Sequence, residues 1–327
     1  LNLCRIELRP SARHQMGRKR SEEPGLERSQ GVSRGPASSR LRRPERDGNG
    51  KEPMPWPEPL GLLGTSFGST SVRPFVADLE HARAEGDRVA EATALVNLGN
   101  AYLELPDAPR AVDCHRQAQA IARESGSRQL EGMAFGGLGI AYAKLPDPQQ
   151  STDSLEKALA IARETRDRAS EGLHLGNLGA VHRHLGEASK AMELHKQALG
   201  IAREIGSREL EANQLRNLGT ACRHLGTLPE AIQHHEEALV IACELGDRKG
   251  EGETLGCLGN DLLVQGKFEQ ALEYFEEALE IAQETGDREN EANWLGGAGN
   301  ALFATVKDRQ IGRIGLRDIP RIFRLTR

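Results

Sequence analysis

Seven of the ten histidines lie between residues 174 and 235, and imidazole nitrogens can bind a metal or transfer a proton. They are His174, His182, His184, His195, His224, His234 and His235. Their spacing lacks the H-x-x-x-H pair that places two metal ligands on one face of a helix. We therefore predict no metal site and no cofactor, and we interpret His182 and His195 as packing residues.

Arginine and histidine recur together in the tetrapeptide Arg-His-Leu-Gly, at Arg183-His184 and again at Arg223-His224. A planar guanidinium group binds a carboxylate through two parallel hydrogen bonds. Asparagine amides donate and accept hydrogen bonds, as the backbone of an extended peptide does. These residue types indicate a surface for an acidic peptide or a peptide C-terminus. The candidate binding residues are Asn97, Asn100, Asn177, Arg183, His184, Arg216, Asn217, Thr220, Arg223, His224, Asn260 and Asn300.

No serine or cysteine occurs in a pattern typical of a catalytic nucleophile. The five cysteines form no C-x-x-C pair, and their odd number favours reduced thiols in an intracellular protein over disulfides or zinc ligands. An Arg-x-x-Glu pair recurs six times, whereas a catalytic residue is expected once. We interpret these pairs as structural, through i,i+3 pairing and contacts between repeats. The sequence thus predicts a protein that is not an enzyme.

A period of forty residues organises the chain from Gly86 to Thr305. The dipeptide Leu-Gly marks one position of this period and occurs at Leu98, Leu138, Leu178, Leu218 and Leu258. A triplet related to Gly-Asp-Arg marks another and begins at Gly86, Gly126, Arg166, Gly206, Gly246 and Gly286. Because no insertion interrupts the period, we predict five full repeats over residues 86–285 and the first half of a sixth.

Each repeat has the pattern of two helices. In the fifth repeat, Asp247 is a suitable N-cap and Gly286 a helix-stop signal. Leu255, Leu258 and Leu262 share one apolar helical face. The Leu-Gly glycines fall within helices, at a cost of up to ~1 kcal/mol each relative to alanine, which indicates a closely approaching neighbour helix. The predicted fold is all-α, an α-solenoid of stacked antiparallel helix pairs.

The first repeat resembles the tetratricopeptide-repeat pattern L-x-x-L-G-x-x-Y…A…A through Leu95, Leu98, Gly99, Tyr102, Ala111 and Ala118. The strings NLGN at 97–100 and CLGN at 257–260 also resemble the LGN/Pins-type G-protein-signalling-modulator scaffolds and long tetratricopeptide arrays. This resemblance implies a right-handed superhelix whose first helices line a concave groove for partner peptides. In that groove the period places Arg183 beside Arg223 and His184 beside His224, on helices about 10 Å apart. An acidic peptide docked across the third and fourth repeats is the favoured interpretation, and a merely solvated polar surface is the alternative.

Charge is uneven along the chain. Residues 1–50 carry twelve Lys and Arg against six Asp and Glu, so the remainder has a net charge of −11 within a total of −5. This acidic balance argues against nucleic-acid binding by the repeats. No apolar run approaches the ~20 residues of a membrane helix, and we expect a cytoplasmic protein. The basic strings at 17–20 and 40–46 suit weak contacts with anionic surfaces.

Three parts are predicted along the chain. A disordered flank rich in Arg, Ser, Gly and Pro occupies residues 1–72, a solenoid that begins with a short helix occupies 73–305, and a basic tail or degenerate cap occupies 306–327. We predict a non-catalytic scaffold or adaptor that binds a protein partner through an acidic or extended peptide. The alternative is the sensor or regulatory portion of a larger signalling or effector protein, with its catalytic or nucleotide-binding domain elsewhere.

Overall fold

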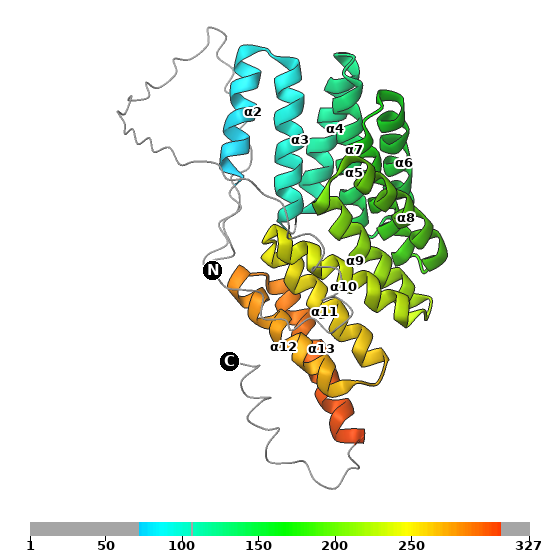
Figure 1. Cartoon of the computed structure of the whole chain (residues 1–327). Helices are drawn as coiled ribbons and strands as arrows, with labels where there is room; N and C mark the ends of the chain where they lie inside the picture. Colours follow the sequence, from blue (N-terminus) through cyan, green and yellow to red (C-terminus); the bar gives the residue numbers. More distant parts are fainter. Residues whose placement is uncertain (1–71, 106, 309–327) are drawn as a thin grey trace, which may run out of the picture. The chain divides into compact units, whose positions relative to one another are not determined.

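The computed structural model describes residues 72–105 and 107–308, and these form twelve helices (Figure 1). The expected flank, apart from Val72, and the expected tail from Arg309 lie outside the described residues. Helix α2 (Arg73–Glu85) precedes the repeats. We call the first helix of each pair an A helix: α3 (Arg88–Glu104), α5 (Arg128–Lys144), α7 (Arg168–His184), α9 (Arg208–His224), α11 (Arg248–Val264) and α13 (Arg288–Asp308). The B helices are α4 (Ala108–Glu124), α6 (Pro148–Thr165), α8 (Ala188–Ile205), α10 (Leu228–Leu245) and α12 (Phe268–Thr285).

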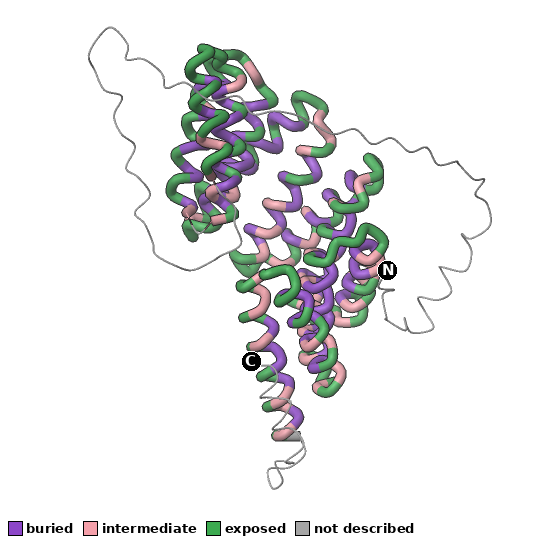
Figure 2. Tube along the Cα trace, turned by 90° about the vertical axis from the view of Figure 1, so that its left-hand side faces the viewer, coloured by how far each residue is buried: buried purple, intermediate pink, exposed green. Residues whose placement is uncertain are grey.

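The predicted solenoid of antiparallel helix pairs is confirmed. Each B helix packs on the A helix before it and on the A helix after it, and each A helix also packs on the A helices of adjacent repeats. Successive B helices have at most marginal contact within the described part of the chain. The A helices therefore form the more closely spaced row of the stack. Figure 2 shows the buried residues on the helix sides that face neighbouring helices, with the turns exposed.

The helix ends follow from the repeated caps. The Asp87 carboxylate accepts hydrogen bonds from the backbone N–H groups of Val89 and Ala90 at 3.0 and 2.9 Å, and Asp247 accepts one from Gly250 at 2.9 Å. Several helices end in the left-handed backbone region, which glycine adopts without a Cβ clash. The residues at these ends include Gly86, Gly206, Gly246 and Gly286, with φ of 68–71°.

Arg166 occupies this left-handed position at the end of α6, with φ of 57°. A residue with a Cβ is strained there, at a cost of roughly 1–2 kcal/mol. Arg166→Gly is therefore expected to raise the free energy of unfolding by about 1 kcal/mol, measured as a higher urea midpoint at an unchanged m-value. Arg166→Ala removes the same charge but keeps the Cβ, so a comparable gain in that control would contradict the explanation.

The glycines within the A helices make room for one large side chain of the B helix. A Cβ added at Gly99 would lie 2.6 Å from the His115 ring, and one at Gly259 would lie 2.9 Å from the Phe275 ring. The residues at this B-helix position are at most 1% exposed and are His115, Leu155, His195, His235 and Phe275. The expected close approach is thus confirmed, and a large side chain fills the space that glycine leaves.

The recurring Arg-x-x-Glu pairs join consecutive helices, as predicted. Arg88 contacts Glu91 at 2.7 Å and also Glu124 at the end of α4 at 2.7 Å. Glu91 in turn contacts Arg83 at the end of α2 at 2.9 Å. Equivalent pairs are Arg128–Glu131, Arg168–Glu171, Arg208–Glu211, Arg248–Glu251 and Arg288–Glu291. Because they repeat in every unit, these pairs belong to the architecture of the stack.

Candidate functional site

All twelve predicted binding residues lie on A helices. The side chains of Asn177, Arg183, Arg216, Asn217, Thr220, Arg223 and Asn260 are half-buried, and those of Asn97, Asn100, His184, His224 and Asn300 are exposed. Within the described part of the chain, none of the six asparagines makes a side-chain hydrogen bond. Their amides are therefore available to a ligand. Asn97 and Asn100 on α3 and Asn300 on α13 lie at opposite ends of the repeat array.

The structure brings Arg183 and His184 on α7 together with Arg223 and His224 on α9. Burial lowers the pKa of His224 below its usual value, and the nearby Arg223 and Arg183 lower it further. Burial and Arg183 lower the pKa of His184 in the same way. Two neighbouring arginines therefore create a local positive potential that disfavours further protonation of either histidine.

Two of the predicted arginines have a carboxylate partner within the chain. Arg216 Nη2 lies 2.8 Å from Glu253 Oε2 on α11, and Arg223 Nη1 lies 2.9 Å from Asp261 Oδ1 on the same helix. Both guanidinium groups are largely shielded, with side-chain exposures of 17% and 15%. Arg223 also donates to the backbone carbonyl of Cys257 at 3.3 Å. These two arginines are thus held in place by α11 and are not free cations.

A buried ion network lies beneath Arg223. The Asp261 carboxylate is fully buried and contacts His235 Nδ1 at 2.5 Å, while His235 Nε2 lies 3.0 Å from the carbonyl oxygen of Arg216. Because both ring nitrogens face acceptors, both donate, and His235 is an imidazolium. Burial is the largest single effect and opposes this charge, but the hydrogen bonds and charge interactions with Asp261 and Cys257 together outweigh it and raise the pKa of His235 to about 9.

The sequence alone indicates no role for Asp261 or His235. The repeat pattern does mark Asp261 as unusual, because the equivalent position in every other repeat holds a small apolar residue. The residues there are Ala101, Ala141, Val181, Ala221 and Ala301. Ion pairing to a histidine 26 residues earlier depends on how α10 and α11 pack, and the repeat pattern does not contain that information.

Cations outnumber carboxylates in this cluster. Arg183, Arg216, Arg223 and His235 carry positive charge, whereas Glu253 and Asp261 supply the negative charge. Although burial opposes ionisation of the Cys257 thiol, His235 and Arg223 lower its pKa. Arg183 has no carboxylate partner among the described residues, and its buried Nε atom makes no hydrogen bond. The cluster therefore has an excess of positive charge at the A-helix surface.

The tetratricopeptide-repeat family model matches residues 90–164, 130–204, 170–244 and 250–309, more than half of the sequence. The chain belongs to the tetratricopeptide-repeat family. Domains of this kind typically serve as protein- or peptide-binding scaffolds. No curated protein sequence matches the chain. The finer resemblance to LGN/Pins-type scaffolds is not tested by the family model and stays a prediction.

Solved structures with the same fold share little sequence with these tetratricopeptide repeats. BtubC from P. vanneervenii is 20% identical with a TM-score of 0.56, and the match covers 66% of this chain and 91% of that chain. The signal transduction ATPase with a tetratricopeptide repeat sensor from Pyrococcus horikoshii is 18% identical with a TM-score of 0.57, over 73% of this chain but only 40% of that one. The Rap conjugation gene regulator of plasmid pLS20, in complex with the Phr* peptide, is 17% identical with a TM-score of 0.58 and coverages of 70% and 66%. At these identities the likeness shows the fold alone.

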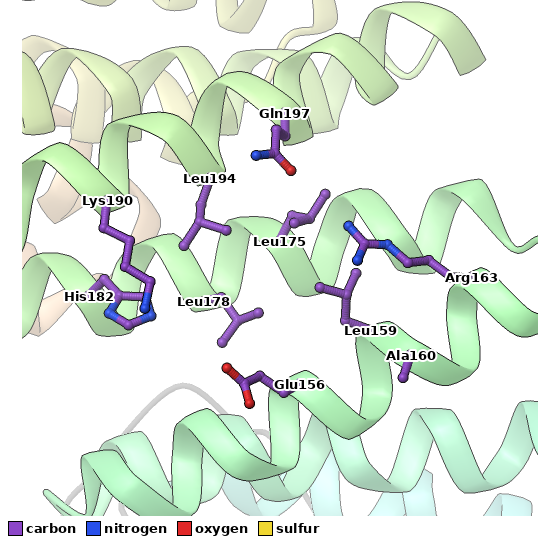
Figure 3. Close-up of a pocket in the computed structure, with 10 residues that line it drawn as sticks. All are labelled: Glu156, Leu159, Ala160, Arg163, Leu175, Leu178, His182, Lys190, Leu194 and Gln197. Carbon is purple, nitrogen blue, oxygen red and sulfur yellow. The ribbon is translucent and has the colours of Figure 1, made fainter.

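A hollow of about 340 Å³ lies between α6, α7 and α8 (Figure 3). Leu159, Leu175, Leu178 and Leu194 give it an apolar lining, and Glu156, Lys190 and Gln197 are polar groups around it. None of the predicted binding residues lines this hollow.

The described residues contain no group of three or more His, Cys, Asp or Glu side chains able to hold a metal. Each described helix is too short or too polar to cross a bilayer.

Proposed function

We propose that this tetratricopeptide-repeat protein is a non-catalytic scaffold or adaptor that binds an acidic, extended peptide of a protein partner along its A helices. The observation that carries the proposal is the excess of positive charge along the successive A helices α7, α9 and α11, within a chain whose net charge is negative. The free amides of Asn177, Asn217 and Asn260 on the same three helices supply donors and acceptors for a peptide backbone. The peptide bound to the Rap regulator supports this use of the fold.

The proposal predicts charge-dependent peptide binding by the full chain. Fluorescein-labelled peptide pools of the form X4-Glu-Glu-X4, with blocked ends, should bind at least ten-fold more tightly than matched pools with Gln-Gln at the centre. Their affinity should fall as salt rises from 50 to 500 mM, because added ions screen partly exposed charges. Fluorescence anisotropy measures both effects. Equal affinity for the two pools, or no binding of either, would contradict the proposed function.

A further inference from the structure

Arg183 differs from the other two arginines of the cluster in its partners. Glu253 pairs with Arg216 and Asp261 pairs with Arg223, whereas no described carboxylate pairs with Arg183. The nearest polar contact of its guanidinium group is His184 Nε2, 3.3 Å from Nη2. Because Nη2 of a protonated arginine can only donate, His184 accepts at this atom and is neutral in this arrangement. Arg183 therefore contributes a positive charge that its immediate neighbour does not balance.

This charge is also partly withdrawn from water. The Arg183 side chain is half-buried, and burial together with the nearby Arg223 lowers its pKa below the usual arginine value. A buried polar atom without a hydrogen bond costs free energy, and the Nε of Arg183 is such an atom. A ligand anion beside the exposed part of the guanidinium group would offset the lost hydration through its charge, without a hydrogen bond to the buried Nε.

We infer that Arg183 is the residue that binds the carboxylate of the partner peptide, whereas Arg216 and Arg223 position the surface around it. This inference rests on the proposed function. Arg223 is fixed by the buried Asp261, and His235 uses both ring nitrogens internally, so neither is free to receive a ligand. The ligand meets one guanidinium group flanked by a neutral histidine. A carboxylate accepts two parallel hydrogen bonds from one guanidinium group.

The second repeat supplies a safe substitution for the test. Ala143 stands forty residues before Arg183 on the exposed surface of α5, so Arg183→Ala introduces a residue that this helix position already accepts. Arg183→Lys keeps the charge but removes the planar fork. Arg123→Ala on α4 is the matched control, since it removes one exposed arginine from a B helix.

The experiment measures binding of the full chain to three blocked pools with Glu-Glu, Gln-Gln or phosphoserine at the centre, and to a Gln-Gln pool with a free C-terminus. Arg183→Ala should weaken binding of a carboxylate pool about ten-fold or more, Arg183→Lys should weaken it less, and Arg123→Ala should leave it unchanged. The blocked Glu-Glu pool offers only side-chain carboxylates at its centre, and the Gln-Gln pool with a free C-terminus offers a terminal carboxylate. Comparing the two shows which kind of carboxylate the protein binds. Circular dichroism should show unchanged helicity in all variants.

The outcomes separate the two proposals. If the Glu-Glu pool binds wild type and Arg183→Ala equally, the assignment of Arg183 is wrong while the acidic-peptide function stands. If the phosphoserine pool binds most tightly and depends on Arg183, the ligand is not a carboxylate. If no pool binds the wild-type chain, the proposed function itself fails.

Discussion

Replacing Asp261 with alanine is expected to lower the free energy of unfolding by about 3–5 kcal/mol, because it leaves two shielded cations without their shared anion. Asp261 is fully buried between Arg223 and His235. Alanine itself fits the backbone, since it stands at the same position in most other repeats, as at Ala221 and Ala301. The loss therefore measures broken ion pairing, and urea unfolding at neutral pH gives its size.

The fifth repeat and the sixth half-repeat provide an apolar residue set for a control variant of the ion network. Forty residues after Arg223, His235 and Asp261 the chain has Leu263, Phe275 and Ala301. The triple variant R223L/H235F/D261A transplants this apolar set, and it should regain most of the stability lost in Asp261→Ala, because well-packed apolar groups can replace a buried ion network. A triple variant that is no more stable than the single one would contradict this account, as would a loss below about 1 kcal/mol in Asp261→Ala.

The network also predicts a pH dependence of definite sign. The folded-state pKa of His235 is about 9, above the ~6.5 of an unfolded histidine, so the folded protein holds more protons between these values. The stabilisation by His235 is therefore complete below pH ~6.5 and is lost as the pH rises through 9. The stability of wild type relative to the triple variant should therefore fall over this range, as measured by urea unfolding of both proteins at pH 6.5 and pH 9.

Replacing His115 with phenylalanine is expected to have the opposite effect and to raise the free energy of unfolding by about 1–3 kcal/mol at neutral pH. His115 is fully buried, and neither ring nitrogen has a hydrogen-bond partner in the described structure. Phe275 at the equivalent position packs against Gly259 and Gly297, as His115 packs against Gly99 and Gly137. The repeat array thus already accommodates phenylalanine in this setting.

The stability gain of His115→Phe over wild type should be larger at acidic pH. Burial lowers the pKa of His115 to about 4, below the ~6.5 of the unfolded chain, so between these values the unfolded chain binds more protons. Wild type should therefore lose up to about 3 kcal/mol as the pH falls from 6.5 to 4, and His115→Phe should not suffer that loss. Urea unfolding at pH 7 and pH 4.5 measures both quantities. Equal stability of the two proteins at pH 4.5 would contradict the prediction.

His195→Phe is the control for position. His195 occupies the same position in the third repeat, but in wild type its Nδ1 lies 2.9 Å from Gln214 Oε1. Phenylalanine there would leave the buried Gln214 oxygen without that donor. A smaller gain, or a loss, is expected.

The sequence was sufficient for the features that repeat. The forty-residue period predicted the stacked helix pairs, the caps such as Asp247 and the structural role of the Arg-x-x-Glu pairs. It was not sufficient for the pairing of single-copy residues. Arg216 and Arg223 looked free because their partners, Glu253 and Asp261, lie in the next repeat, 37 and 38 residues further along the chain. A repeat pattern reports what positions have in common, whereas this site consists of exceptions to the pattern.

The A-helix glycines that contact a B-helix ring also affect the cooperativity of unfolding between repeats. The His115 ring lies against Gly99 of its own repeat and Gly137 of the next, and Phe275 lies between Gly259 and Gly297 in the same way. At the central interfaces the second position holds Asn177, Asn217 or Cys257 instead of glycine. In a one-dimensional array, stability is the sum of each repeat's own term and its coupling to its neighbours. At the two terminal interfaces one ring therefore packs against a glycine of both adjacent units. We expect this contact to couple their unfolding, as the ion pairs of Asp261 couple the fourth and fifth repeats.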